Sequence, residues 1–228
     1  MLKHTSILTH ILLIFTLCSS SVQGVLNQED SLLKNDVVAR LATLRQFVPQ
    51  KHYKWYVRWA CDKIYQYGTL EGSQQGNAHW INIQFSSGEK LIFDKSNPII
   101  ALYPNKLSLC QPEAFTLPLH NLPGVCIHMV AMPFLGWDIV HYSKTAKLGR
   151  RAIRVLLAKD HLRCEVFLDK NFNTILQAKM WDLKSDFRTS FTLKHLKKFK
   201  SGWGIQAAEF TLNNRKTLLY VDDVKTLD

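Results

Sequence analysis

The chain of 228 residues lacks the signatures of the common catalytic sites. It has no Gly-x-Ser-x-Gly elbow, no phosphate-binding loop and no His-Glu-x-x-His helix, so nothing in it points to the enzymes that depend on these motifs. No pair among its five cysteines has the tight spacing of a structural zinc site. We therefore predict a protein that is not an enzyme and that needs no metal ion or other cofactor.

Long apolar runs are also missing after the N-terminal segment, and the chain contains no Asn-x-Ser/Thr glycosylation site. The N-terminal segment begins with the basic Lys3, continues with an apolar stretch over residues 7–17 and ends at Gly24. This is the order of a secretory signal peptide, and the stretch is too short to cross a bilayer. We predict a signal peptide over residues 1–24 and a single mature domain over residues 25–228, exported to a bacterial periplasm.

Cysteines are few, and four of them remain after the signal peptide: Cys61, Cys110, Cys126 and Cys164. An oxidising compartment permits disulfides, and four cysteines allow three complete pairings. Cys110 and Cys126 flank a proline-containing segment, which favours a bridge that closes this loop. The alternative is that all four are small buried apolar side chains, which is as good an interpretation for Cys61 and Cys164.

After the signal peptide, the spacing of apolar residues changes once, from a helical repeat to the alternation of a strand. Residues 29–48 carry apolar side chains at spacings of three and four, which predicts an amphipathic helix. From Tyr53 onward aromatic and polar residues alternate, which predicts a half-buried strand, followed by a turn over residues 68–76. Further short strand-like runs follow with short connections, which require antiparallel neighbours. The sequence therefore predicts a mainly β (α+β) chain whose antiparallel sheet meanders and curls.

The segment over residues 112–147 breaks this pattern with prolines and glycines, so we expect irregular structure with a short helix over residues 135–142. Its many apolar side chains indicate a lid over an apolar space, and a plug of the core is the alternative. Asp138 and His141 could be drawn as an acid and a base of a secreted enzyme. Because nothing places a nucleophile beside them, a helix cap and a surface imidazole are the preferred interpretation.

The chain is basic, with a net charge of +11. This excess attracts anionic lipid, polymer or protein, although a solvated outer face is the plainer interpretation of such charge runs. Aromatic residues alternate with charges along the strands as they do on a core face, so we predict no nucleic-acid binding. The residues that would dock on an anionic membrane surface or an envelope protein are Lys147, Arg150, Arg151, Arg154, Lys194, Lys197 and Lys198.

The C-terminal half carries a family resemblance in the runs Arg151–Leu157, Cys164–Asp169, Ile175–Asp182, Phe199–Trp203, Ala208–Leu212, Lys216–Tyr220 and Asp223–Lys225. The order of strand, acidic turn, strand, Gly-Trp turn and paired closing strands resembles that of the outer-membrane lipoprotein-sorting proteins, the LolA-like carrier superfamily. The run Met132–Asp138 is similar to the mid-chain lid region of that family.

The resemblance implies a strongly curved antiparallel sheet of about ten or eleven strands, forming an open half-barrel plugged by an N-terminal helix and a mid-chain lid. It further implies a periplasmic, monomeric lipid- or lipoprotein-binding protein that sorts or carries acyl chains in outer-membrane biogenesis. The alternative is an extracytoplasmic sensor or scaffold domain that binds a protein partner. The residues expected to line the apolar cavity or the core are Tyr53, Trp55, Val57, Trp59, Phe134, Trp137, Ile153, Val155, Phe191 and Leu193.

Overall fold

A computed structural model describes residues 31–45, 53–61, 63–75, 78–88, 90–94, 100–103, 106–109, 118–119, 122–199 and 202–226. The predicted signal peptide lies outside these residues, and the extent of one mature domain stays a prediction. The chain divides into two compact units whose boundary falls between Arg40 and Leu41, within the N-terminal helix.

The N-terminal helix covers residues 31–45, within the predicted range of 29–48. Val37, Leu41 and Leu44 are buried, whereas Leu32 and Val38 are exposed, so the apolar face is narrower than the sequence pattern indicated. Among the described residues, no helix has the length and apolar character needed to cross a membrane.

The remaining elements follow in chain order as β1 (Tyr53–Cys61), β2 (Ile64–Gln75), β3 (Ala78–Phe85), β4 (Lys90–Asp94), β5 (Ile100–Tyr103), β6 (Lys106–Leu109), β7 (Pro118–Leu119), β8 (Leu122–Cys126), α2 (Ile127–Ala131), η2 (Pro133–Gly136), β9 (Asp138–Lys147), β10 (Arg150–Lys159), β11 (Leu162–Asp169), β12 (Ile175–Asp182), β13 (Arg188–Phe199), β14 (Gly202–Leu212) and β15 (Arg215–Thr226). The fold class is mainly β, as predicted.

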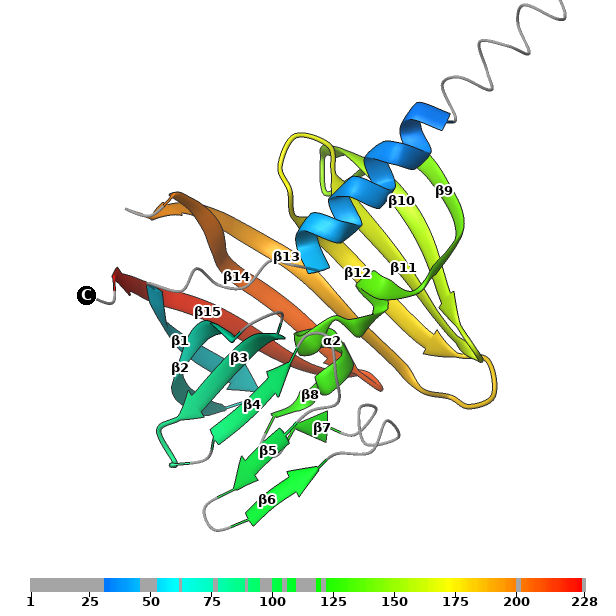
Figure 1. Ribbon diagram of the computed structural model, residues 1–228. Helices are drawn as coiled ribbons and strands as arrows, with labels where there is room; N and C mark the ends of the chain where they lie inside the picture. Colours follow the sequence, from blue (N-terminus) through cyan, green and yellow to red (C-terminus); the bar gives the residue numbers. More distant parts are fainter. Residues whose placement is uncertain are drawn as a thin grey trace, which may run out of the picture. The chain divides into compact units, whose positions relative to one another are not determined.

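The described strands form one antiparallel sheet of thirteen strands in the order β6-β5-β4-β3-β2-β1-β15-β14-β13-β12-β11-β10-β9, together with the small pair β7-β8 (Figure 1). The two ends of this order, β6 and β9, do not pair with each other, so the sheet is open. Every neighbour in the sheet is also a neighbour along the chain except one. Strand β1 pairs with the last strand, β15, and joins two meanders side by side.

Two predicted elements were wrong, and they account for the two strands of the large sheet, β2 and β9, that the sequence pattern did not reveal. The small pair β7-β8 was not predicted either, because it falls in the segment expected to be irregular. Residues 68–75 of the predicted turn over residues 68–76 are instead part of β2, because they pair with β3, and the first of them also with β1, and residue 76 lies outside the described residues. The predicted helix over residues 135–142 falls on η2 and β9. Strand β9 forms a hairpin with β10, in which Lys147 pairs with Arg150, and this pairing overrides the local helical pattern.

The mid-chain segment comprises β8, α2 and η2, and it packs on one face of the sheet. Strand β8 contacts β14, β15 and β1, α2 contacts β13, and η2 contacts β10. Figure 1 shows this green segment crossing the strands of the C-terminal meander. We call the sheet face that it contacts the covered face and the opposite one the outer face. The predicted lid is therefore an ordered layer on the covered face.

Candidate functional site

The covered face carries a continuous row of buried side chains. Cross-strand pairing places in one row, over β10 to β15, the residues Val155, Val166, Ala178, Phe191, Phe210 and Thr217. Each has an exposed fraction of 4% or less. The rings of Phe191 and Phe210 meet edge to face with centroids 5.4 Å apart, and Trp59 of β1 extends the aromatic cluster at 5.8 Å from Phe210.

The mid-chain segment closes over this row with apolar side chains and very close backbone contact. Leu122, Met129 and Phe134 are each 1% exposed or less. The N–H of Gly124 donates to the hydroxyl of Thr217 at 3.2 Å. A Cβ atom on Gly124 would lie 2.6 Å from backbone atoms of β15, so no larger residue fits between segment and sheet.

Seven of the ten residues predicted to line a cavity or the core are buried in the structure. Those with an exposed fraction of 5% or less are Val57, Trp59, Phe134, Ile153, Val155, Phe191 and Leu193. Trp55 and Trp137 are half-buried, and the side chain of Tyr53 lies outside the described residues. In this structure the buried members form a packed core, and their role as the lining of a ligand cavity stays a prediction.

The cysteine positions give no support to the predicted bridge. Cys126 is a free, buried cysteine whose Sγ lies 3.3 Å from the hydroxyl of Thr189 on β13, and Cys110 lies outside the described residues. Cys61 and Cys164 are also buried, as the alternative interpretation held. Burial raises the pKa of the Cys126 thiol, and it raises the pKa of Cys164 well above its usual range, so both thiols stay protonated at neutral pH.

His128 is a buried ionisable group within the mid-chain segment. It lies on α2 with an exposed fraction of 6%, and its ring meets Trp137 edge to face at 6.2 Å. Burial, and to a smaller extent the charge of Lys159, lower the pKa of His128 from 6.5 to about 4. The imidazole is therefore neutral at physiological pH, and its protonation would place a buried charge between the segment and the sheet.

The acid and base considered for an enzyme are not joined in the structure. Asp138 and His141 are both exposed residues of β9, and no hydrogen bond or ion pair connects them within the described ranges. No group of three or more potential metal ligands occurs in the described part of the chain. The described residues thus give the pair Asp138 and His141 no geometry of an acid and a base.

Most of the predicted docking residues already have partners on the outer face. Arg150 pairs with the buried Asp169, Arg154 pairs with Glu165 at 2.6 Å, and Lys194 pairs with Glu209 at 3.2 Å.

Of the other docking candidates, Lys147 lies over the ring of Phe167 at 4.7 Å, and Lys197 lies 5.5 Å from that of Phe199. Arg151 and Lys198 are exposed and have no ion pair among the described residues. Their docking role stays a prediction.

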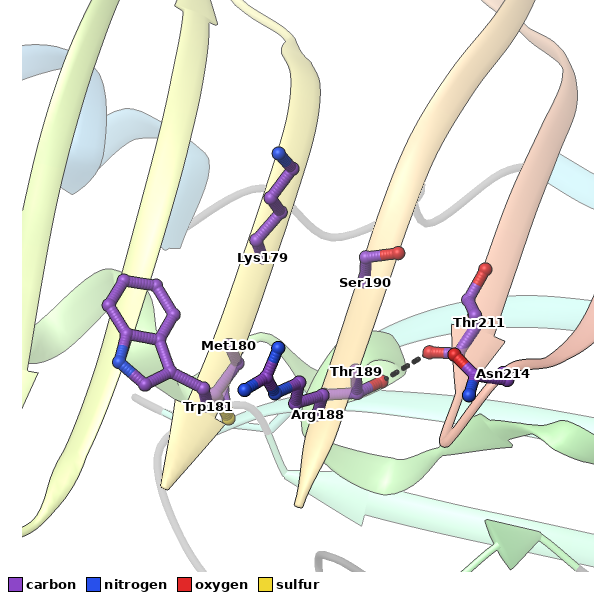
Figure 2. Close-up of a pocket in the computed structure, with 8 residues that line it drawn as sticks. All are labelled: Lys179, Met180, Trp181, Arg188, Thr189, Ser190, Thr211 and Asn214. Carbon is purple, nitrogen blue, oxygen red and sulfur yellow. Dashed lines mark hydrogen bonds between the residues drawn. The ribbon is translucent and has the colours of Figure 1, made fainter. Parts of the chain in front are cut away.

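A hollow of about 390 Å³ lies on the outer face over β12, β13 and β14 (Figure 2). It is lined by Lys179, Met180, Trp181, Arg188, Thr189, Ser190, Thr211 and Asn214. A second hollow of about 320 Å³ adjoins η2 and is lined by Arg45, Met132, Pro133, Gly136, Trp137, Asp138, Ala158 and Lys159. Trp137 is the one predicted cavity residue that lines either of these two hollows.

The outer-face hollow was not predicted from the sequence, because three strands contribute to it and no single run contains it. Its basic residues, Lys179 and Arg188, are nine positions apart in the chain but lie on adjacent strands. A signal was present in the alternation for Lys179, which falls between the buried Ala178 and Met180 and therefore faces outward.

Comparisons with known proteins give a likeness in fold. No family model and no curated protein matches the sequence. A domain assigned to the outer membrane lipoprotein-sorting proteins, from Vibrio parahaemolyticus, superposes with a TM-score of 0.63 at 10% identity, covering 82% of this chain and 90% of that one. A DUF1329 family protein from Desulfovibrio piger gives a TM-score of 0.64 at 9% identity, with 84% and 90% covered.

The LolA superfamily protein NE2245 from Nitrosomonas europaea is similar over 85% of this chain and 93% of its own, with a TM-score of 0.57 and 9% identity. The agreement extends over almost the whole length of each of these structures. The chain therefore has the fold of the LolA-like, lipoprotein-sorting proteins, which confirms the resemblance predicted from its C-terminal strands.

Proposed function

We propose that this chain is a periplasmic binding protein that holds acyl chains of a lipid or lipoprotein between the covered face and the mid-chain segment. The observation that carries the proposal is the uninterrupted apolar row across β10 to β14, which ends at Thr217 on β15 and is closed by a separate layer. The likeness to a lipoprotein-sorting domain supports it, as does the signal-peptide pattern of the first 24 residues.

To bind in this fold, an acyl chain must replace apolar side chains of the mid-chain segment on the covered face. In the structure Phe134 and Met129 occupy the covered face and are fully buried. A chain of roughly ten methylenes would gain about 8 kcal/mol from burial of its apolar surface. This is comparable to the loss incurred when two large side chains leave a core, at about 3–5 kcal/mol each. Cargo uptake therefore proceeds by displacement of the segment, with no catalytic residue.

The contacts of the segment are compatible with such displacement. The hydrogen bonds between the segment and the sheet include one from Gly124 to Thr217 and one between Cys126 and Thr189. The segment also buries the apolar side chains of Leu122, Met129 and Phe134. Apolar contacts are non-directional, so an acyl chain can replace those of the segment without matching a particular geometry.

A reversible cross-link tests the proposal directly. The Sγ of Cys126 lies 3.3 Å from the hydroxyl of Thr189, so in a Thr189→Cys variant a small movement allows a disulfide that locks the segment onto β13. The measurement is native mass spectrometry of the full exported chain, incubated with a fatty-acylated peptide. We expect uptake by the reduced variant and by a Thr189→Ser control, and at least about a tenfold loss of uptake in the oxidised variant.

Equal uptake by the oxidised and reduced forms would contradict binding beneath the segment. Absence of uptake by every form, with no lipid in extracts of the protein purified from a periplasm, would reject the carrier hypothesis. The alternative would then remain, in which the chain is a sensor or scaffold domain and its covered face stays filled by its own side chains.

A further inference from the structure

The polar side chains of the hollow lie on the outer face, whereas two of its lining residues, Met180 and Thr189, have side chains buried on the covered face. Along β12 the exposed Lys179 and half-buried Trp181 alternate with the buried Ala178 and Met180. Pairing then aligns Lys179 with Ser190 on β13, and Ser190 with a threonine on β14. A ligand in this hollow would therefore not share space with an acyl chain on the covered face.

The hollow holds two cations that lack carboxylate partners. Neither Lys179 nor Arg188 takes part in an ion pair within the part of the chain that the structure describes, and no aspartate or glutamate lines the hollow. Other cations of the same outer face behave differently, since Arg154 and Lys194 each pair with a glutamate. Glu165 of β11 lies opposite Lys179 in the register, but this glutamate pairs with Arg154, so neither Lys179 nor Arg188 has an ion pair of its own among the described residues.

Neutral hydrogen-bond donors complete the lining. The side chains of Ser190, Thr211 and Asn214 make no hydrogen bond with other described residues, so each can donate to a ligand. The floor is fixed, because the hydroxyl of Thr189 donates to the backbone carbonyl of Thr211 at 2.9 Å and ties β13 to β14 (Figure 2).

We propose that the outer-face hollow binds the phosphate group of a small polar molecule. A guanidinium offers a planar pair of donors that matches a phosphate, which suits Arg188 to this group. The amine of Lys179 extends away from Arg188 in Figure 2, so its long side chain would have to turn toward the phosphate to add its charge. The volume of about 390 Å³ falls in the range of small-molecule sites and exceeds what an isolated ion needs. Trp181 also lines the hollow, with its ring directed away from Ser190 and Thr211 (Figure 2).

The phosphate could belong to a soluble phosphorylated molecule or to a phospholipid head group, and the test separates these sources. Isothermal titration calorimetry of the full chain uses sn-glycerol 3-phosphate, inorganic phosphate and glycerol as probes. Vesicle sedimentation uses phosphatidylglycerol vesicles, with phosphatidylcholine vesicles for comparison. The variants are Arg188→Gln and Lys179→Gln. The matched control is Lys63→Gln, which removes the same charge from an exposed turn between β1 and β2.

We expect glycerol phosphate to bind and glycerol not to bind at physiological salt. Arg188→Gln should weaken binding about tenfold and Lys179→Gln about fivefold, because charge-assisted hydrogen bonds are lost, whereas Lys63→Gln should change it less than about twofold. Unchanged thermal unfolding of these surface variants verifies that each is folded. A similar loss in vesicle binding for Arg188→Gln would identify a head group as the source. A loss confined to the soluble probes would identify a free phosphorylated molecule.

The proposal is overturned if neither probe class depends on Arg188 more than on Lys63, since binding would then reflect only the net positive charge. It is equally overturned if glycerol binds as tightly as its phosphate. A failure of this site leaves acyl-chain uptake under the segment untouched, because the two lie on opposite faces of the sheet.

Discussion

Protonation of His128 should destabilise the protein at mildly acidic pH. The pKa of this residue is about 4 in the folded chain, chiefly because of burial, and 6.5 is the ordinary value expected in the unfolded chain. Between these values the unfolded state binds more protons, so stability is complete above pH 6.5 and falls as the pH decreases toward 4. Each pH unit in this window costs about 1.4 kcal/mol, and the full loss is about 3 kcal/mol.

The loss can be measured by urea unfolding, followed through the fluorescence of the six tryptophans. Between pH 6.5 and pH 5 we expect a loss of about 2 kcal/mol, which lowers the urea midpoint by about 1 M for an m-value of roughly 2 kcal/mol/M. His128→Gln should flatten this slope. His141→Gln, which changes an exposed histidine of β9, is the control and should keep it. An identical pH slope in wild type and His128→Gln would refute the argument.

Two further predictions concern stability and use the same urea assay. Gly124→Ala should destabilise the protein by about 2 kcal/mol or more, because the new Cβ atom would lie 2.6 Å from the backbone of Lys216. The control is Gly149→Ala, which changes a glycine of positive φ with open space around it and should cost only about 1 kcal/mol. Equal losses of stability in the two variants would contradict the close-contact argument. Asp169→Asn should cost about 2 kcal/mol, because this buried carboxylate pairs with an arginine of β10 and accepts two backbone N–H bonds. The same exchange at Asp182, which serves an exposed turn, should cost less than half as much, and the reverse order would disprove the assignment.

The alternation of apolar residues predicted most of the strands of the sheet correctly. It worked in β10 to β15 because one face of each strand is buried and the other is wet, so the period of two is visible in the sequence. It failed for β2, where Gly68 and a run of polar residues imitate a turn. That strand is held between two neighbours by backbone pairing, a non-local interaction that no local pattern records.

The candidate site was predicted only in part. The apolar members of the covered face, such as Val155 and Phe191, follow from alternation alone, and both are buried. Whether such residues face a ligand or another side chain depends on the layer above them. That layer is supplied by β8, α2 and η2, whose close approach to the sheet depends on Gly124. Charge runs were less informative still, since the pairing of Arg150 with Asp169 joins residues on different strands.

The pairing of β1 with β15 has a consequence for the order of folding. Tyr53 lies opposite Thr226, so the first strand of the sheet finds its second neighbour only when almost the entire chain is available. Before this pairing forms, β1 lacks its second neighbour and would be an edge strand with unpaired backbone groups. Closing so long a loop is slow. A chain delivered from its N-terminus would therefore leave β1 open to pairing with any other extended segment until β15 arrives.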